Sequence, residues 1–310
     1  MIYSITLNPA IDHIIESDNF TIKQTNYYQN EYQVVGGKGI NVAIILNNLE
    51  NQVQATGVMG ADNKSIFLDK FDEVKVPNHF FFNPGKTRTN YKIKNLSLKE
   101  ETELNGLGFT TQAKTWKDLL DYLKSKITKD DIIVAAGSIA KGIPNDIYAQ
   151  IGVIANNVGA KFILDATGTV MLKALSSKPF LIKPNIDEIC GILNLPIKEY
   201  TFEEIKSMIL QLQKLGAQNI LLSMGSDGSY YFTSNQDIYQ TGIAQGKLVN
   251  SVGAGDSMLA GFTHGVSQNL DIQECLKLAA ASGAATAFKE WLATKAEIIK
   301  LINEIKVKKI

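Results

Sequence analysis

The chain has 310 residues, of which 45% are hydrophobic, so it can bury a large core and does not belong to the disordered class. Its 31 basic and 31 acidic residues balance, so no net charge draws it to nucleic acid or to anionic membranes. No apolar run is long enough to span a bilayer, and the first residues lack the pattern of a signal peptide. We therefore expect a cytoplasmic protein in which any bound anion is held by a local site.

Two stretches, at about residues 10–35 and 84–108, read as exposed strands with no long helix to cover them. We expect them to form one small sheet that projects from the main domain. Such a sheet can close over a site or pair with a partner subunit. Within these stretches, Asp12 could accept hydrogen bonds from sugar hydroxyls, and Arg88 could grip a phosphate with its planar fork. A turn aspartate and a surface arginine explain the same residues equally simply.

A glycine cluster between the two stretches, residues 36–39, leads directly into a helical pattern. Its flexible backbone lets a ligand approach closely, Lys38 offers a point charge for a phosphate, and Asn41 can hydrogen-bond sugar hydroxyls. The chain contains no Walker A loop, and no Gly-x-Gly-x-x-Gly follows a strand. These absences count against a P-loop kinase and a Rossmann dehydrogenase.

Through the second half of the chain, short β-rich runs alternate with longer helical patterns, which is typical of a parallel sheet covered on both faces. The expected helices are residues 116–126, 146–157, 202–215, 257–268 and 272–288, and the expected strands are residues 131–136, 161–165, 180–183 and 219–223. Small or polar residues end these strands, at the edge where ligands bind in an open α/β sheet. Cys190 and Cys275 lie in apolar helical patterns, which predicts buried free thiols.

Two motifs follow predicted strands. Asn185 and Glu188 are three residues apart at a helix start, so they could face one ion through water, as magnesium prefers. A helix cap with an acid in the first turn explains them better on these residues alone. The run from Ser223 to Gly228 could pass under a nucleotide or simply turn a β-hairpin.

The strongest single motif is residues 253–256, Gly-Ala-Gly-Asp, which leads into an apolar helix. Free amides and the helix dipole there can stabilise the charge on a transferring phosphoryl group. Asp256 lies in the first turn, where it could take the proton of an acceptor hydroxyl. By themselves these residues fit a tight turn with a capping aspartate equally well.

Taken in chain order, residues 8–12, 36–41, 87–88, 183–188 and 252–257 resemble the motifs of the PfkB carbohydrate kinases of the ribokinase-like fold. The resemblance covers the whole chain as a single kinase domain, residues 1–310. It implies an α/β fold, a three-layer α/β/α sandwich with a mostly parallel central sheet and a small β-sheet lid, and a homodimer formed through the lids. It also implies transfer of the γ-phosphoryl group of ATP to a sugar hydroxyl with Mg²⁺.

The resemblance assigns a role to each motif residue. Asp256 would be the base, and Gly253, Ala254, Gly255 and Asp256 would form the anion hole. The sugar phosphate would be held by Asp12, Gly37, Lys38, Asn41 and Arg88, with Glu103 and Ser138 as weaker candidates. The nucleotide site would comprise Lys183, Asn185, Ser223, Gly225, Gly228 and Gly255, while Asn185 and Glu188 would organise the metal through water.

Within the family, the motifs look most like those of the 1-phosphofructokinases, which implies conversion of fructose 1-phosphate into fructose 1,6-bisphosphate. Tagatose-6-phosphate kinases are the near neighbours, and a non-catalytic sugar-phosphate sensor is the alternative of another class. Val35, Glu50 and the pair Ile139 and Ala140 depart from the usual family residues. These departures concern local loops, and the last one weakens a role for Ser138.

Overall fold

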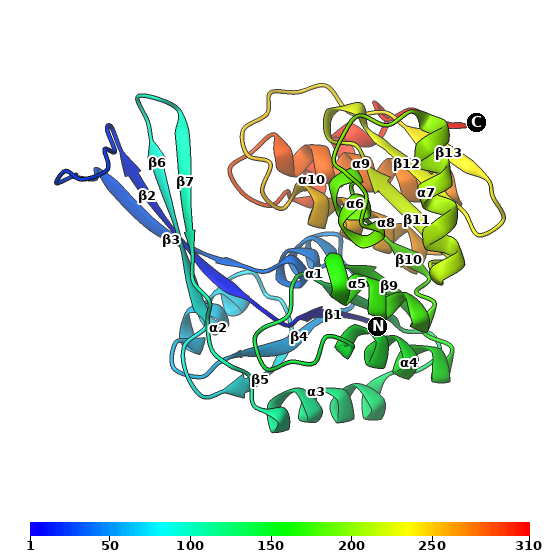
Figure 1. Ribbon diagram of the computed structural model, residues 1–310, viewed down its shortest axis with the longest axis horizontal. Coiled ribbons are helices and arrows are strands. Elements are labelled where there is room, and N and C mark those ends of the chain that lie inside the picture. Colours follow the sequence, from blue (N-terminus) through cyan, green and yellow to red (C-terminus); the bar gives the residue numbers. More distant parts are fainter.

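A ten-stranded sheet forms the centre of the computed structural model, which describes residues 1–310 (Figure 1). Seven neighbouring strands are parallel, and the last three at one edge are antiparallel. In spatial order the strands are β14 (Val307–Lys309), β13 (Ile238–Thr241), β12 (Ser229–Phe232), β11 (Asn219–Ser223), β10 (Leu181–Ile182), β9 (Lys161–Asp165), β8 (Ile132–Ala136), β1 (Ile2–Thr6), β4 (Val53–Gly60) and β5 (Asn78–Asn83).

Side chains alternate across this sheet and divide the core into two halves. In β8, Ile132 and Val134 pack into one buried cluster, and Ile133 and Ala135 pack into the other. One cluster is covered by α1 (Lys38–Asn48), α2 (Lys64–Glu73), α8 (Ala254–Ser267), α9 (Ile272–Ala287) and α10 (Lys295–Ile302). The other is covered by α3 (Ala113–Lys126), α4 (Ile147–Val158), α5 (Gly168–Ala174), α6 (Ile186–Leu193) and α7 (Phe202–Leu215). The predicted three-layer sandwich is confirmed.

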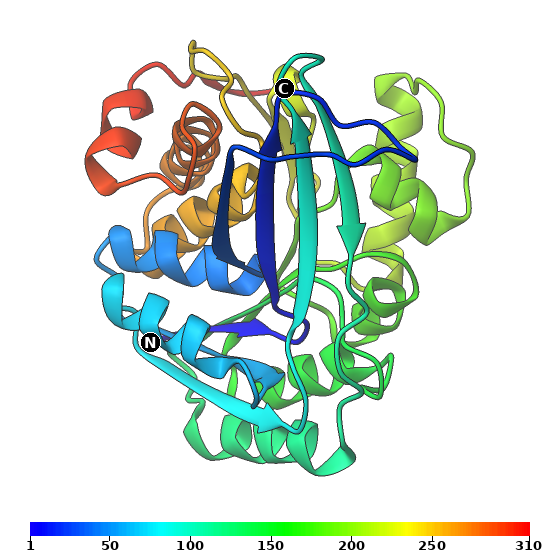
Figure 2. The ribbon, with the colours of Figure 1, turned by 90° about the vertical axis from the view of Figure 1, so that its left-hand side faces the viewer.

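A second sheet of four strands stands away from this body, as Figures 1 and 2 show. Its order is β3 (Asn30–Gly36), β2 (Ala10–Ser17), β6 (Arg88–Asn95) and β7 (Glu100–Asn105). The central pair β2 and β6 is parallel, with Asp12 opposite Asn90, and the outer strands pair with it antiparallel. Both stretches predicted to project from the main domain thus join in one sheet, which we call the lid.

The predicted element bounds agree well with the structure. The helix predicted at residues 202–215 has those limits in the structure. The bounds of the other four predicted helices differ from the observed ones by three residues or fewer at either end. The predicted strand 180–183 is reduced to Leu181 and Ile182, because Pro184 follows at once and has no amide to donate. Cys190 and Cys275 are buried and unbonded, as predicted. Every helix is too short or too polar to cross a bilayer.

Candidate active site

A cleft of about 1030 Å³ lies between the lid and the body. The lid lines it with one face of β2 and β6, and the body lines it with the starts of α1, α6 and α8. Of the residues predicted to form a site, the cleft collects Asp12, Gly37, Lys38, Asn41, Arg88, Lys183, Asn185, Glu188, Ser223, Gly253, Gly255 and Asp256. Motifs separated by more than 200 residues in the sequence therefore share one cavity.

The start of α8 presents unpaired amides to this cleft. Gly253 is the N-cap residue and has φ 79°, a left-handed conformation that favours glycine, and no side chain caps the helix. No protein group accepts a hydrogen bond from the amides of Gly255 or Asp256. Because free amides and the positive end of the helix dipole attract anions, this helix start can bind a phosphoryl group.

Asp256, in the first turn of α8, is only 7% exposed. Asn41 Nδ2 donates a hydrogen bond of 2.8 Å to its Oδ2 atom. Burial, and secondly the negative charge of Asp165, raise the pKa of Asp256 to about 6, while the Asn41 hydrogen bond, Lys38 and Lys183 act in the opposite direction. A carboxylate with this pKa is ionised at neutral pH and is basic enough to take a proton from a hydroxyl during its attack.

A buried acid that the sequence analysis did not single out lies beside Asp256. Asp165 ends β9 and is fully buried. Its Oδ1 atom accepts a 3.0 Å hydrogen bond from Lys38 Nζ, and its Oδ2 atom forms a 3.1 Å ion pair with Lys183 Nζ. Burial alone would raise the pKa of Asp165, but the two lysines outweigh it and hold the pKa below the ordinary value. The sequence signal that could have identified Asp165 is its position as a polar residue at the carboxyl end of a buried strand.

The start of α1 brings Lys38 into the same network. A Cβ atom on its N-cap residue, Gly37, would lie 2.9 Å from Thr6 Cγ2, so only glycine fits there without a shift. Burial lowers the pKa of Lys38, but the charges of Asp165, Asp256 and Glu188 raise it by more. Lys38 is therefore a firmly charged group on the body side of the cleft, already paired with Asp165.

The lid contributes a row of polar side chains from one face of the sheet. Asn90 Nδ2 donates a 2.8 Å hydrogen bond to Asp12 Oδ1, and Lys92 Nζ lies 3.5 Å from Asp12 Oδ2. Arg88 donates 3.4 Å hydrogen bonds to the carbonyl oxygens of Asn8 and Pro9. Lys92 lines the cleft but was not predicted as a site residue.

The structure does not place Glu103 or Ser138 in the lining of the cleft. Glu103, on the lid edge strand, lies 3.5 Å from Lys92 Nζ and reaches the cleft only through that lysine. Ser138 is exposed and accepts a 3.0 Å hydrogen bond from Asn8 Nδ2. The loop after β8 thus carries Ser138 to the side of the site, so neither residue has the direct contact that we expected.

Asn185 and Glu188 form a reciprocal capping box at the start of α6. The Glu188 amide donates to Asn185 Oδ1 at 2.8 Å, and the Asn185 amide donates to Glu188 Oε2 at 3.0 Å. The second carboxylate oxygen, Oε1, lies 3.9 Å from Lys38 Nζ. No three His, Cys, Asp or Glu side chains are grouped to hold a metal by themselves. A carboxylate oxygen with only this long contact fits Mg²⁺, which takes most of its ligands from water and phosphates.

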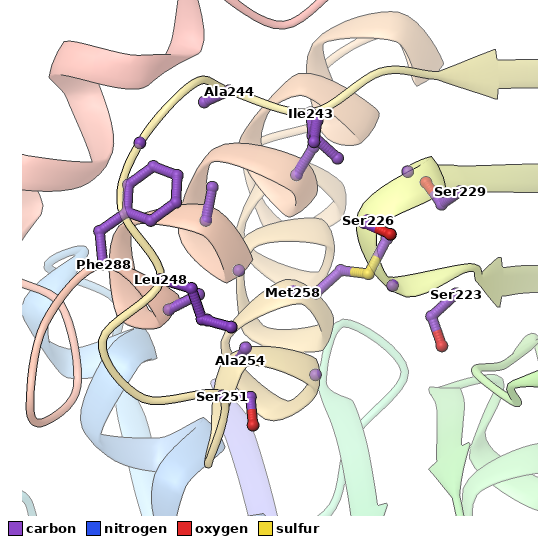
Figure 3. A pocket seen from close by; sticks show the side chains of 18 of the residues that line it. Ser223, Ser226, Ser229, Ile243, Ala244, Leu248, Ser251, Ala254, Met258 and Phe288 are labelled. Carbon is purple, nitrogen blue, oxygen red and sulfur yellow. The ribbon is translucent and has the colours of Figure 1, made fainter. Parts of the chain in front are cut away.

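A second cavity, of about 710 Å³, adjoins the cleft (Figure 3). Ser223, Gly225 and Gly228 line it where β11 turns into β12, so this segment forms both a hairpin and a cavity wall. Apolar residues, including Ala244, Leu248, Met258 and Phe288, line much of the remainder. Lys183, which we expected in a nucleotide site, lines only the cleft.

The two cavities meet at the start of α8. Both are lined by five residues: Asn185, Ser223, Leu248, Ser251 and Gly255. Gly255 is the only one of these that belongs to the Gly-Ala-Gly-Asp motif, and Asp256 follows it on the cleft side. A molecule in the smaller cavity can therefore present a group to the free amides of α8 while a second molecule occupies the cleft.

The chain matches known proteins over nearly its whole length. It is 37% identical over 307 residues to a 1-phosphofructokinase from Bacillus subtilis (strain 168), with 99% of each chain covered. It is 32% identical over 292 residues to a tagatose-6-phosphate kinase from Staphylococcus epidermidis, covering 94% of this chain and 93% of the relative.

A solved structure, phosphofructokinase-2 from Escherichia coli in complex with fructose-6-phosphate, matches with a TM-score of 0.89 and covers 98% of each chain. Its sequence identity is 22%, so this likeness bears on the fold alone. Residues 2–298 match the family described as pfkB family carbohydrate kinase. The chain therefore belongs to the pfkB family of carbohydrate kinases and is a sugar phosphotransferase.

Proposed function

We propose that this kinase transfers the γ-phosphoryl group of ATP to fructose 1-phosphate and forms fructose 1,6-bisphosphate. The observation that carries the proposal is the position of Asp256, a buried base beside free helix amides at the meeting point of two cavities. The smaller cavity has the volume and the apolar wall that a nucleotide base needs, and the cleft has the polar lining that a sugar phosphate needs.

The reaction requires one proton transfer and one exchange of P–O bonds. The free primary hydroxyl of the sugar attacks the γ-phosphorus, and its proton passes to Asp256 as the new bond forms. The bond from the γ-phosphorus to the bridging oxygen breaks, and ADP leaves with that electron pair. The amides of Gly255 and Asp256 stabilise the charge on the transferring group.

The phosphate that the substrate already carries would bind on the lid side. Lys38 is paired with Asp165 at 3.0 Å on the body side, whereas Arg88 has no carboxylate partner and Lys92 has only 3.5 Å contacts with Asp12 and Glu103, so these two are the better cations for this phosphate. Arg88 donates hydrogen bonds to two carbonyl oxygens at 3.4 Å. These bonds are long, so a phosphate can easily replace the carbonyl oxygens as the acceptor. Binding there would direct the opposite end of the sugar towards Asp256.

Mg²⁺ is expected to accompany ATP and would neutralise charge on the phosphates. Glu188 and Asn185 would hold it through water, with the Glu188 Oε1 atom as the available carboxylate oxygen. The capping box keeps both side chains in fixed positions, so the metal site would be shaped before the nucleotide binds.

Tagatose 6-phosphate is the second candidate substrate, because a relative of that activity matches at 32% identity over 94% of this chain. Both sugars carry one phosphate and a free primary hydroxyl, so the lid cations serve either. A coupled ADP-release assay over fructose 1-phosphate, tagatose 6-phosphate, fructose 6-phosphate and unphosphorylated sugars separates them. We expect the highest kcat/KM with fructose 1-phosphate. Faster turnover of tagatose 6-phosphate would reverse the assignment, and turnover of none would refute it.

We also propose that the protein is a homodimer joined through its lids. Tyr91 and Leu104 face each other across β6 and β7, on the side of the lid away from the cleft, and are 41% and 68% exposed. Light scattering should give twice the chain mass, and Leu104→Lys should give the mass of one chain. A monomeric wild-type protein would contradict this proposal.

A further inference from the structure

Asp165 is the most deeply buried charge in the protein, and its environment is unusual. Its two carboxylate oxygens each take one lysine, Lys38 at 3.0 Å and Lys183 at 3.1 Å. Asp165 is fully buried, and Lys183 is 5% exposed. Burying the Asp165 carboxylate and the Lys183 ammonium group requires excellent mutual geometry, since both lose their hydration, whereas the Lys38 side chain stays 37% exposed. A core of the same shape could be filled by apolar residues, so stability alone does not explain this arrangement.

The two lysines come from different elements, Lys38 from the start of α1 and Lys183 from the segment after β10. A Cβ atom built on Gly255 would lie 3.4 Å from Lys183 Nζ, so this ammonium group lies against the first turn of α8. Lys38 extends from the start of α1 and lines the cleft, where it and Asp256 each perturb the pKa of the other. One carboxylate thus contacts two cations, of which Lys183 lies against the first turn of α8 and Lys38 acts on the charge of Asp256.

We propose that Asp165 is a positioning residue that holds Lys38 and Lys183 where they face the transferring phosphoryl group. The inference rests on the kinase activity proposed above. Asp165 makes no contact with substrate in this account, and it acts through the two lysines. Transition-state charge is stabilised best by groups that are already in place, so the value of Asp165 lies in preventing either lysine from moving away.

Asparagine at this position is an informative substitution. Asn keeps the volume of Asp, but one of its two terminal atoms is an amide nitrogen that can only donate. An ammonium group also only donates, so one of the two lysines must lose its partner. Asp165→Asn should therefore lower kcat by about tenfold or more, as expected when fixed electrostatic groups are lost from a transition state.

The acid limb of the pH profile distinguishes positioning from a merely structural role. The charged groups around Asp256 are Asp165 on β9, Lys38 on α1, Lys183 after β10 and, through Lys38, Glu188 on α6. Loss of the Asp165 charge removes a repulsion, so the pKa of Asp256 should fall and the acid limb should move to lower pH. Loss of a cation in Lys183→Met should move the limb to higher pH. Opposite shifts from two neighbouring substitutions are not expected from general loosening of the fold.

Asp131→Asn provides the matched control. Asp131 is also a buried aspartate beside the sheet, paired with the N-terminal amine at 2.9 Å, but it precedes β8 and lies at the opposite edge from the site. It should lose stability with little change in kcat. Thermal melting of all variants shows which of them fold. If Asp165→Asn does not fold, the Lys183→Met profile decides.

The test is the dependence of kcat/KM on pH for wild type, Asp165→Asn, Lys183→Met and Asp131→Asn. The substrate phosphates also titrate near pH 6, so the reading is the difference between variants measured with the same substrates. Opposite movements of the acid limb, with kcat reduced in both site variants, are the expected result. An unmoved limb, or a kcat for Asp165→Asn equal to that of Asp131→Asn, would overturn the inference. A wild-type protein without turnover would instead refute the proposed function, so failure of the proposed function and failure of this inference give different results.

Discussion

The two sides of the cleft are built differently. On the body side, Asp165, Asp256 and Lys183 are at most 7% exposed, and each charge has a fixed partner. On the lid side, Arg88, Lys92 and Asp12 are partly exposed, and although Asn90 donates a 2.8 Å hydrogen bond to Asp12, the contacts of the cations Arg88 and Lys92 are loose, at 3.4 to 3.5 Å. Rigid, desolvated groups suit the stabilisation of a transition state, whereas partly exposed cations with long contacts suit the capture and release of a substrate. The comparison assigns chemistry to the body and substrate binding to the lid.

The largest effect should come from the body side. Asp256→Asn removes the base, so kcat should fall by about 10²- to 10⁴-fold, the range for loss of general-base catalysis. The KM for ATP should stay within a few-fold, because the nucleotide cavity is lined by other residues. Steady-state kinetics with both substrates varied would check this. A near-normal kcat would remove Asp256 from the mechanism and end the assignment of chemistry to the body side.

The same substitution should stabilise the protein at neutral pH. The pKa of Asp256 is raised to about 6, so its ionised form is unfavourable in the folded state. Stability is therefore lost as pH rises from about 4 towards the folded pKa, by up to about 3 kcal/mol at about 1.4 kcal/mol per unit. Asp256→Asn should gain up to that amount at pH 7 and nothing near pH 4. Urea denaturation at the two pH values measures the gain, and equal stability of both proteins at pH 7 would show that Asp256 is not strained.

On the lid side, Arg88→Ala should raise the KM for the sugar phosphate by about 10- to 100-fold, which corresponds to one lost hydrogen-bonded charge. The values of kcat and of KM for ATP should change little. Arg88→Lys keeps the charge but loses the planar fork, so its KM for the sugar phosphate should lie between those of the wild type and Arg88→Ala. If kcat fell instead while the sugar KM held, the lid would share in the chemistry and the contrast between the two sides would fail.

The smallest expected effect tests whether the start of α6 is more than a cap. Asn185→Ala and Thr201→Ala each break a capping box, one in the cleft and one at α7. Both should lose about 1 kcal/mol of stability. Only Asn185→Ala should also raise the Mg²⁺ concentration needed for half-maximal activity. Identical behaviour of the two variants would reduce Asn185 to a structural cap.

The sequence predicted much of the body and the lid because helical periodicity and strand alternation are local signals. The anion-binding helix start at residues 253–256 was also predicted, since glycines directly before an apolar helix indicate free amides wherever they occur in a chain. Asp165 was missed because its importance depends on two lysines that are 127 and 18 residues away along the chain. Lys92 was missed because a lysine on an exposed strand has no local feature that distinguishes a cleft from solvent.

Ser138 and Glu103 were predicted as weaker candidates, and the structure places both beside the cleft lining. Glu103 contacts the lining residue Lys92 directly, and Ser138 is two contacts from the lining residue Arg88, through Asn8. The motifs identified the right neighbourhood in both cases. Which side chain points into a cavity is decided by loop conformation and strand pairing, and short motifs do not specify either.

Phosphorus NMR of the wild-type protein with ATP, Mg²⁺ and fructose 1-phosphate can follow the proposed phosphoryl transfer itself. We expect the γ-phosphate signal of ATP to disappear as a second phosphomonoester signal grows on the sugar, and Asp256→Asn to slow both changes together. A γ-phosphate signal that persists, or that is converted only into inorganic phosphate, would contradict the claim that Asp256 directs phosphoryl transfer to this sugar.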